Sequence, residues 1–347
     1  MKQLTYIVLA MILFSCGQKQ ESGEQIIINR MDYVYGLKTV IDRDIWKGFN
    51  ESKYDVPLVY YTDSSCFVAN PLKRFMDAYK PELVYENEGL KIYKSVLVDS
   101  VPFHMAANLS LGDDEGEYNF ESPYLACSSF EIARNVIPDL NSTEEWMTML
   151  VHEYFHGFQF KHKGFIDYFQ KNAMNLSSRD LKKLYFSNKW FKEIVDKEND
   201  LLLKAIASDD KKVIRECVNK FFELRDKRRA LAVERLKLDI KSVEETYETM
   251  EGTARYIEFS LYGKFAKMEP DAKLAKCDTS YCSFAKFKDF DINNDQWLFD
   301  TKKTTYFYAT GYNILRLFDK LGIEYKSRLF KEKGLSLEKI LKTSVEL

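Results

Sequence analysis

The sequence predicts an α+β protein with a small mixed sheet in its first half and a mostly helical second half. Residues 56–61, 90–98 and 103–109 are rich in β-branched and aromatic side chains, which is typical of strands. From residue 165 to about 264, apolar and charged residues interleave at helical spacing almost without a break. Glycine and proline are scarce, with 14 and 7 copies in 347 residues, which suits long helices better than a sandwich of short strands.

Shorter elements complete this prediction. Apolar side chains recur at helical spacing near residues 42–49, and the G-D-D-E-G stretch at 112–116 predicts a turn after the third strand. Ser142, with Glu145 three residues later, predicts a capping box at the start of a helix. The folded chain then divides into an α+β part over 30–164, a helical insertion over 165–240 and a helical part over 241–347.

The first residues predict a targeting segment. Lys2 precedes an apolar run over 6–14 that is too short to span a bilayer. The L-F-S-C stretch ending at Cys16 resembles a bacterial lipobox. This resemblance implies a signal peptide over 1–15, a lipid on Cys16, a tether over 16–29 and attachment to a membrane of the bacterial envelope, with the outer membrane expected and the face left open. A plain secretory peptide or an N-terminal anchor is the alternative.

The remaining cysteines are odd in number, so at least one thiol is expected to be free. Cys277 and Cys282 bracket a loop-like stretch in which a local disulfide is possible in an oxidising envelope. For Cys66, Cys127 and Cys217, we expect buried structural positions.

The charge balance, with 51 basic and 53 acidic residues, argues against a nucleic-acid-binding protein. The densest basic cluster lies at residues 225–229, inside an amphipathic helical stretch with acidic neighbours. We therefore predict a solvated helix face there and no anion-binding patch.

The most informative stretch is H-E-x-x-H at residues 152–156, which holds two of the four histidines in the chain. On an α-helix, positions i and i+4 lie on one face, so His152 and His156 can reach the same Zn²⁺. Glu153 projects beside them, where it can hold and deprotonate a water molecule as a general base. The alternative is a chance match on an amphipathic core helix.

A catalytic zinc ion usually has three protein ligands, so the two histidines need a partner. His162 has the spacing of the third metzincin histidine, but Gln159 stands where the pattern H-E-x-x-H-x-x-G-x-x-H has glycine. If the helix continues past Gln159, His162 turns away from the metal. Gly157 is a possible break, but it comes two residues too early, and His162 stays as the second candidate.

The stronger candidate is Glu251, in the string M-E-G-T-A-R-Y at residues 250–256. This string resembles the N-E-G-x-A-x-Y element of gluzincins of the aminopeptidase type, with Met250 in place of asparagine. The resemblance implies a zincin-like catalytic domain in which Glu251 completes the zinc site from a second helix. The 94 residues between His156 and Glu251 exceed the family's connection, and the helical insertion accounts for them.

The neighbours of Glu251 allow two interpretations. Gly252 and Ala254 are small, and we expect them to let this helix approach the zinc helix closely. Other acidic residues share roughly one helix face with Glu251, so the alternative is a solvated acidic stripe. These residues are Glu244, Glu248 and Glu258.

Near the C-terminus, the string Y-A-T-G-Y-N-I-L at residues 308–315 resembles the Y-x-x-G-x-x-x-L segment of the same family. The resemblance implies that the Tyr308 hydroxyl donates to the oxyanion of the tetrahedral intermediate, a charge that appears only during the reaction. Tyr306 and Tyr312 are neighbours that could take this role instead.

The exopeptidase signature of the family, G-x-M-E-N, is missing, so aminopeptidase activity is not implied. In related folds, the strand before the zinc helix lines the cleft and pairs with extended substrate backbone. Residues 103–109 and residues 124–132 are both candidates for this strand.

The expected function is zinc-dependent hydrolysis of peptide bonds, with Glu153 as general base and a peptide or protein as substrate. The alternative is a non-catalytic zinc-binding envelope lipoprotein that binds a protein or peptide partner. Hydrolysis of a non-peptide amide in envelope polymers would use the same groups and stays open, as do endopeptidase or exopeptidase action and the oligomeric state.

Overall fold

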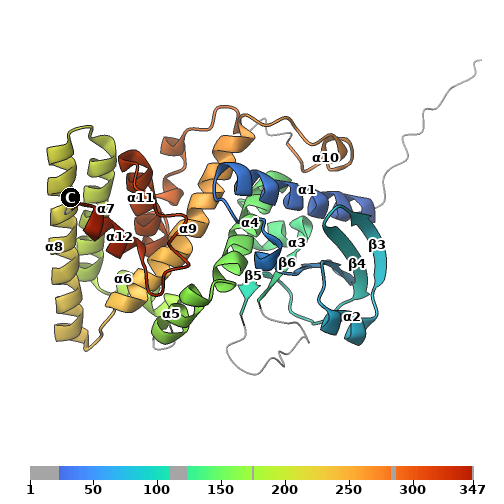
Figure 1. Ribbon diagram of the computed structural model, residues 1–347, viewed down its shortest axis with the longest axis horizontal. Helices are drawn as coiled ribbons and strands as arrows, with labels where there is room; N and C mark the ends of the chain where they lie inside the picture. The colour runs from blue at the N-terminus through green and yellow to red at the C-terminus, as the bar shows by residue number, and fades with distance from the viewer. Residues whose placement is uncertain (1–22, 110–122, 174–175, 283–286, 346–347) are drawn as a thin grey trace, which may run out of the picture.

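The computed structural model describes residues 23–109, 123–173, 176–282 and 287–345. Within them the chain forms one six-stranded mixed sheet and a larger number of helices, which confirms the predicted α+β class. The sheet lies at one end of the molecule and helices α7 and α8 lie at the other (Figure 1). The turn predicted at 112–116 lies outside the described residues.

The sheet has the strand order β3-β4-β2-β1-β6-β5, in which β1 and β6 are parallel and the other neighbours are antiparallel. Its strands are β1 (Leu58–Tyr61), β2 (Ser65–Ala69), β3 (Glu82–Asn87), β4 (Leu90–Val96), β5 (Met105–Asn108) and β6 (Tyr124–Ser128). The three predicted strands are confirmed as β1, β4 and β5. Of the two strands predicted to line the cleft, β5 is an edge strand of the described sheet and β6 is internal.

The helices follow largely as predicted from residue 165 onward. They are α1 (Gly23–Asp44), α2 (Lys73–Tyr79), α3 (Phe130–Val136), α4 (Thr143–Phe160), α5 (Lys163–Ala173), α6 (Ser178–Ser187), α7 (Lys189–Ala207), α8 (Lys211–Leu236), α9 (Lys241–Phe265), α10 (Ala272–Cys277), α11 (Tyr306–Leu321) and α12 (Leu337–Val345), with short 3-10 turns at η1 (Ser52–Tyr54), η3 (Ile292–Asn294) and η4 (Gln296–Leu298).

Helix α1 corrects two predictions. The tether was predicted to reach residue 29, but the helix already begins at Gly23, and the helix predicted near 42–49 ends at Asp44. The physical reason is the apolar spacing along α1, which buries one face against the rest of the fold. The buried residues on this face are Ile28, Met31, Val34, Leu37 and Ile41.

Residues 1–15 and Cys16 lie outside the described part of the chain. None of the described helices combines the length and the apolar character needed to cross a bilayer.

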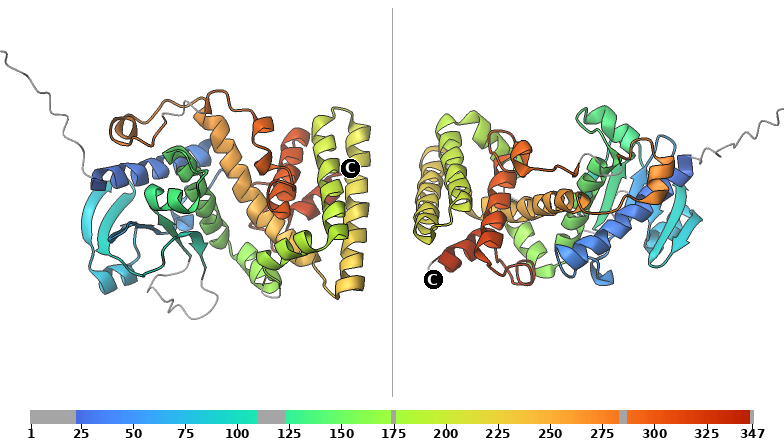
Figure 2. Two further views of the ribbon diagram at one scale, coloured as in Figure 1. Left: turned by 180° about the vertical axis from the view of Figure 1, so that it is seen from behind. Right: turned by 90° about the horizontal axis from the view of Figure 1, so that it is seen from above.

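Helix α4 carries the H-E-x-x-H stretch and lies between the sheet and α9 (Figures 1 and 2). The predicted capping box is present: the Ser142 side chain accepts from the Glu145 backbone N–H, and the Glu145 side chain accepts from the Ser142 backbone N–H. The helix continues through Gly157, where an added Cβ would lie 2.7 Å from a Val56 methyl group. Gly157 therefore provides a close approach to the chain before β1 and does not break the helix.

Helices α9 and α11 cross at two glycines. A Cβ on Gly252 would lie 2.6 Å from Gly311 backbone atoms, and a Cβ on Gly311 would lie 2.2 Å from the Glu248 carbonyl oxygen. The expectation that Gly252 lets α9 approach the zinc helix is therefore wrong, because Gly252 faces α11. The contact instead brings Glu251 and Tyr308 toward one site.

The basic cluster at residues 225–229 is buried, so the predicted solvated helix face is wrong. Arg225, Arg228 and Arg229 are spaced as i, i+3 and i+4, which places them on one inward-facing side of α8. Their partners are carboxylates from three other helices: Glu198 of α7, Glu244 and Glu248 of α9, and Glu338 of α12.

The cysteine predictions are confirmed in part. Cys66, Cys127 and Cys217 are buried, as expected. Cys277 and Cys282 are not joined by a disulfide, so the local disulfide that the sequence allowed is not formed. The Cys277 sulfur instead accepts a hydrogen bond from the Asn29 side chain at 3.4 Å.

Replacing Gly311 by alanine is expected to destabilise the protein, because the new methyl group would overlap the Glu248 carbonyl oxygen. Overpacking of this kind costs about 1–3 kcal/mol. The matched control is Gly263→Ala in α9, where an added Cβ meets nothing within 4 Å, and it should be neutral or slightly stabilising. Thermal unfolding followed by circular dichroism checks both, and equal melting temperatures for the two variants would contradict the close crossing.

The buried ion pairs predict a loss of stability in acid. Burial alone would raise the pKa of Glu338, but the charges of Arg225 and Arg229 lower it to about 2 from 4.5. Because the unfolded chain takes up this proton more readily, the contribution is complete above about pH 4.5 and is lost as the pH falls toward 2. At neutral pH the contribution is on the order of 3 kcal/mol.

Urea unfolding between pH 7 and pH 3 measures this contribution. Glu338→Gln should lower the free energy of unfolding at pH 7, and its difference from the wild type should shrink below pH 4.5. The exposed Glu324→Gln change serves as a control. A pH-independent difference for Glu338→Gln would show that its charge is not what stabilises the fold.

Candidate metal centre

Three predicted ligand atoms converge on one point. The Nε2 atoms of His152 and His156 are 3.0 Å apart, and the Glu251 Oε2 atom lies 3.4 and 3.2 Å from them. A tetrahedral zinc ion with ligands at about 2.0–2.1 Å has ligand atoms roughly 3.3 Å apart. The three separations therefore match those of a zinc site, and Glu251 reaches the histidines from α9 as expected.

The His156 ring is held in the tautomer that metal binding requires. Gln159 donates its amide hydrogens to the Met250 carbonyl oxygen and the Thr253 hydroxyl, so its own oxygen faces His156 Nδ1 at 2.9 Å. His156 Nδ1 is thus the donor to Gln159, and the lone pair of Nε2 faces His152 and Glu251. Gln159, which sequence reasoning treated only as a missing glycine, positions the ligand.

His152 has a carboxylate on its far side. Glu258 Oε2 lies 3.4 Å from His152 Nδ1 and 3.5 Å from Arg255 Nε, and all three side chains are buried. The acidic stripe that the sequence offered as an alternative is therefore wrong, because Glu244, Glu248 and Glu258 are buried and paired. The spacing of seven residues between Glu251 and Glu258, two turns of one helix face, is the signal that could have identified Glu258.

The donor set is rich in negative charge. Glu153, Glu251 and Glu258 surround two imidazoles, and burial alone would lower the pKa of His152, but Glu258 and Glu251 raise it to about 10. The cluster thus needs positive charge, which protons or a divalent cation can supply. The Glu251 Oε2 atom is buried without a hydrogen-bond partner, as expected of an atom arranged for a metal.

Glu153 differs from Glu251 in its surroundings. Atoms of His152, Glu153 and His156 lie within 4.8 Å of one another, so distance alone would allow Glu153 to be a ligand. However, its Oε2 atom accepts a 2.7 Å hydrogen bond from the Ala107 backbone N–H of β5. Burial raises the pKa of Glu153, although both histidines act in the opposite direction. Glu153 is thus anchored to β5 beside the three converging atoms.

Tyr308 is the tyrosine that faces the site. Its ring lies 6.1 Å from the His152 ring, and burial, followed by the charge of Glu251 and a hydrogen bond to it, raises the pKa of Tyr308 well above its usual value. Tyr306 instead donates to Glu244 in the buried ion-pair network, and Tyr312 packs against Phe259. The two alternatives therefore lie elsewhere in the helical half.

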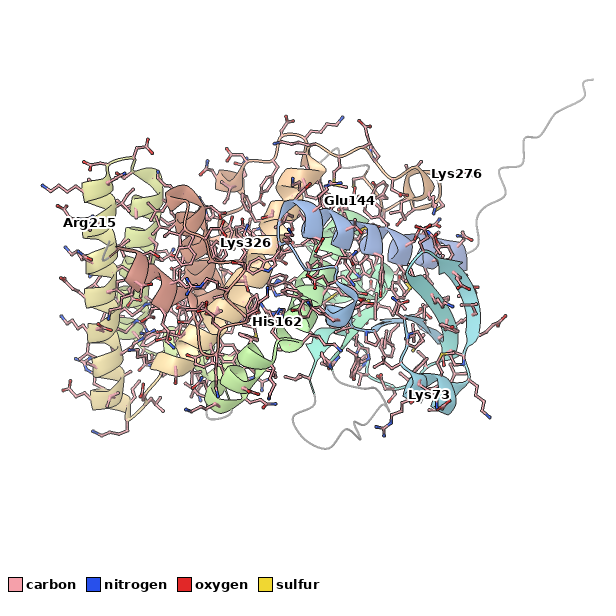
Figure 3. The ribbon with its side chains drawn as sticks, in the orientation of Figure 1. Lys73, Glu144, His162, Arg215, Lys276 and Lys326 are labelled. Carbon is pink, nitrogen blue, oxygen red and sulfur yellow. The ribbon has the colours of Figure 1, made fainter. Side chains whose placement is uncertain are left out.

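His162 lies just beyond the C-terminal end of α4, which ends at Phe160 (Figure 3). Its ring stacks on Tyr54 at 4.2 Å and bonds through Nδ1 to the Phe158 carbonyl oxygen at 2.8 Å. Because α4 runs through Gln159 to Phe160, the ring turns away from the ligands, as the sequence reasoning expected for an unbroken helix.

His152 and Glu153 line a cleft of about 540 Å³, and His156 and Glu251 lie behind them, outside its lining. Its lining comes from both halves of the chain: Met105, Ile137, Asp139, Leu140, Glu145, Met149, His152 and Glu153 on one side, and Arg255, Glu258, Tyr262, Trp297 and Tyr308 on the other. The cleft therefore places the edge strand β5, the general-base candidate and the tyrosine around one space.

Comparisons with protein-family models, with curated proteins and with solved structures give no significant match to this chain. The case for the site therefore rests on its geometry and on the motifs.

The purified protein is expected to bind one zinc ion, and Glu251→Ala should weaken binding at least ~100-fold because one of three ligands is lost. His162→Ala should leave the affinity unchanged, since this ring stacks on Tyr54 and turns away from the three converging atoms. Competition titration with a chromophoric chelator measures both, on variants shown by circular dichroism to be folded. Zinc affinity that falls in His162→Ala and persists in Glu251→Ala would reverse the ligand assignment.

Proposed function

We propose that this protein is a zinc-dependent peptidase of gluzincin type with a zincin-like catalytic domain. The observation that carries the proposal is the convergence of His152 Nε2, His156 Nε2 and Glu251 Oε2, with Glu153 held next to them and not among them. Structural zinc sites use four protein ligands and are closed, whereas three ligands beside a cleft leave a position for water. That difference favours catalysis over a purely structural ion.

The residues of the site have different roles in the proposed reaction. Zinc bound by His152, His156 and Glu251 would supply Lewis acidity toward a water molecule and a carbonyl oxygen. Glu153 accepts the proton of the attacking water and passes it to the leaving amine, and the rise of its pKa on burial makes it a stronger base than an exposed glutamate. Tyr308, next to Glu251, donates its hydroxyl hydrogen to the oxyanion.

Strand β5 supports a peptide as the substrate. Its inner edge pairs with β6, while the Ala107 N–H points outward to Glu153. An extended peptide laid along this outer edge would bring its backbone beside Glu153 and the histidines. Backbone pairing of this kind gives affinity with little dependence on sequence.

The second candidate function is that of a non-catalytic zinc-binding lipoprotein. The same donor set fits this function less well than it fits a peptidase. A carboxylate of Glu153 that lines the cleft beside the ligands has no role in such a protein. We place either activity in the bacterial envelope, with a lipid on Cys16 and the residues before Gly23 as the tether.

Glu153→Gln should retain zinc and lose hydrolysis, because the amide keeps the shape and cannot accept the proton. Removal of a general base costs at least ~10²-fold in rate. The measurement is cleavage of a broad peptide library, read by mass spectrometry, with bound zinc determined on the same samples and the exposed Glu234→Gln as control. A fully active Glu153→Gln variant would refute the mechanism, and a zinc-loaded wild type that cleaves no peptide would favour the binding role.

A further inference from the structure

A second cavity of about 320 Å³ adjoins the cleft at Arg255 and Tyr308, which line both spaces. We call it the cationic cavity, because Arg179, Lys182 and Arg255 line it and none of its described lining residues is acidic. Its other lining residues are Ser178, Thr305, Phe307 and Tyr308. Arg179 and Lys182 belong to α6, in the helical insertion, so the insertion forms one wall of the extended cleft.

Arg255 is a fixed element between the two spaces. Its side chain is only 9% exposed, and its guanidinium carbon lies 4.8 Å from the Trp297 ring and 4.7 Å from the Tyr308 ring. The Nη1 atom donates to the Trp297 carbonyl oxygen at 2.8 Å and to the Thr304 hydroxyl at 3.1 Å. The guanidinium is therefore held before any ligand arrives.

The other edge of this guanidinium makes only a long ion pair with Glu258, at 3.5 Å, and no hydrogen bond among the described residues. The Nε atom is buried without a hydrogen-bond partner, and among the described residues none bonds to Nη2. The Glu258 oxygen at 3.5 Å from Nε is too far for a good hydrogen bond. A buried donor without a partner is costly, and the Nε and Nη2 pair is the edge that binds a carboxylate through two parallel bonds.

We propose that the cationic cavity is a substrate subsite that binds a carboxylate, either an Asp or Glu side chain or a C-terminal α-carboxylate. This inference rests on the proposed peptidase function and names its substrate class. Tyr308 lies 6.1 Å from the His152 ring and 4.7 Å from the Arg255 guanidinium carbon. Since an extended residue spans about 3.3–3.6 Å, the carboxylate lies within roughly three residues of the cleaved bond.

The opposite end of the cleft has the opposite charge. Asp139 and Glu145 line the cleft itself, and an adjoining cavity beyond Trp297 carries Asp289 and Asp291. A substrate carboxylate is repelled there and attracted at Arg255. We therefore expect the enzyme to prefer a substrate carboxylate on one side of the cleaved bond only.

The test uses the zinc-loaded full chain and quenched fluorescent peptides. One series places a single Asp, or Asn in its place, at each of three positions on either side of the cleaved bond. A second series compares a free C-terminal carboxylate with its amide, which separates the two sources of the carboxylate. The wild type should favour the charged member of a pair at least ~10-fold in kcat/KM, on one side of the bond only.

Two double variants identify the residues that cause the preference for a charged substrate. In Arg179→Gln/Lys182→Gln the ratio of charged to neutral substrate should fall toward one. The matched control, Lys183→Gln/Lys189→Gln, removes the same charge from α6 and α7 at positions that do not line the cavity, and it should keep the wild-type ratio.

The outcomes separate this inference from the proposed function. Equal cleavage of charged and neutral peptides, or an unchanged ratio in Arg179→Gln/Lys182→Gln, would overturn the carboxylate subsite while leaving the peptidase in place. If no peptide is cleaved, the peptidase proposal fails and fluorescence anisotropy of the labelled Asp and Asn peptides decides the subsite. The subsite is supported if the wild type binds the Asp peptide more tightly than the Asn peptide and the Arg179→Gln/Lys182→Gln variant does not. Equal binding of the two peptides by the wild type overturns the subsite.

Discussion

The structure depends on the compensation of carboxylates that are buried along α9. An isolated ionised carboxylate is very costly inside a protein, so each one needs a cationic partner. Glu244 and Glu248 meet the arginines of α8. About one and three turns beyond Glu248, Glu251 and Glu258 meet the imidazoles of α4. One helix thus joins a structural ion-pair network to a candidate metal site.

This arrangement explains why a remote residue can complete the site. Helix α9 is fixed at one end by Arg225, Arg228 and Arg229, and along its length by the glycine contact with α11. These constraints fix the position of α9 along its axis and its rotation about that axis, and so determine where Glu251 contacts the histidines. The helical insertion, which supplies the three arginines, is therefore part of the support for the site as well as a wall of the cleft.

Part of this picture could be predicted from the sequence. The spacing of His152 and His156 fixes their shared helix face, and the capping box of Ser142 fixes where that helix begins. Glu251 could be identified through its resemblance to a known motif. Strand β3 was missed because it is a largely exposed edge strand with charged residues. Helix α1 was missed because its N-terminal part looks like a polar tether.

The remaining features depend on tertiary contacts that one sequence does not contain. The arginines at 225–229 look like a solvated face until α7, α9 and α12 supply carboxylates. Gln159 looks like a departure from a metzincin pattern until Met250 and Thr253 orient its amide toward His156. Likewise, the role of Gly252 became clear only when Gly311 was found opposite to it.

The most direct test of the central claim is the position of a zinc ion in a crystal, located by anomalous diffraction at the zinc edge. The structure predicts a peak within about 2 Å of His152 Nε2, His156 Nε2 and Glu251 Oε2, with Glu153 outside the first coordination shell. A peak at His162, or an ion bound by the two histidines with Glu251 turned away from it, would contradict the account.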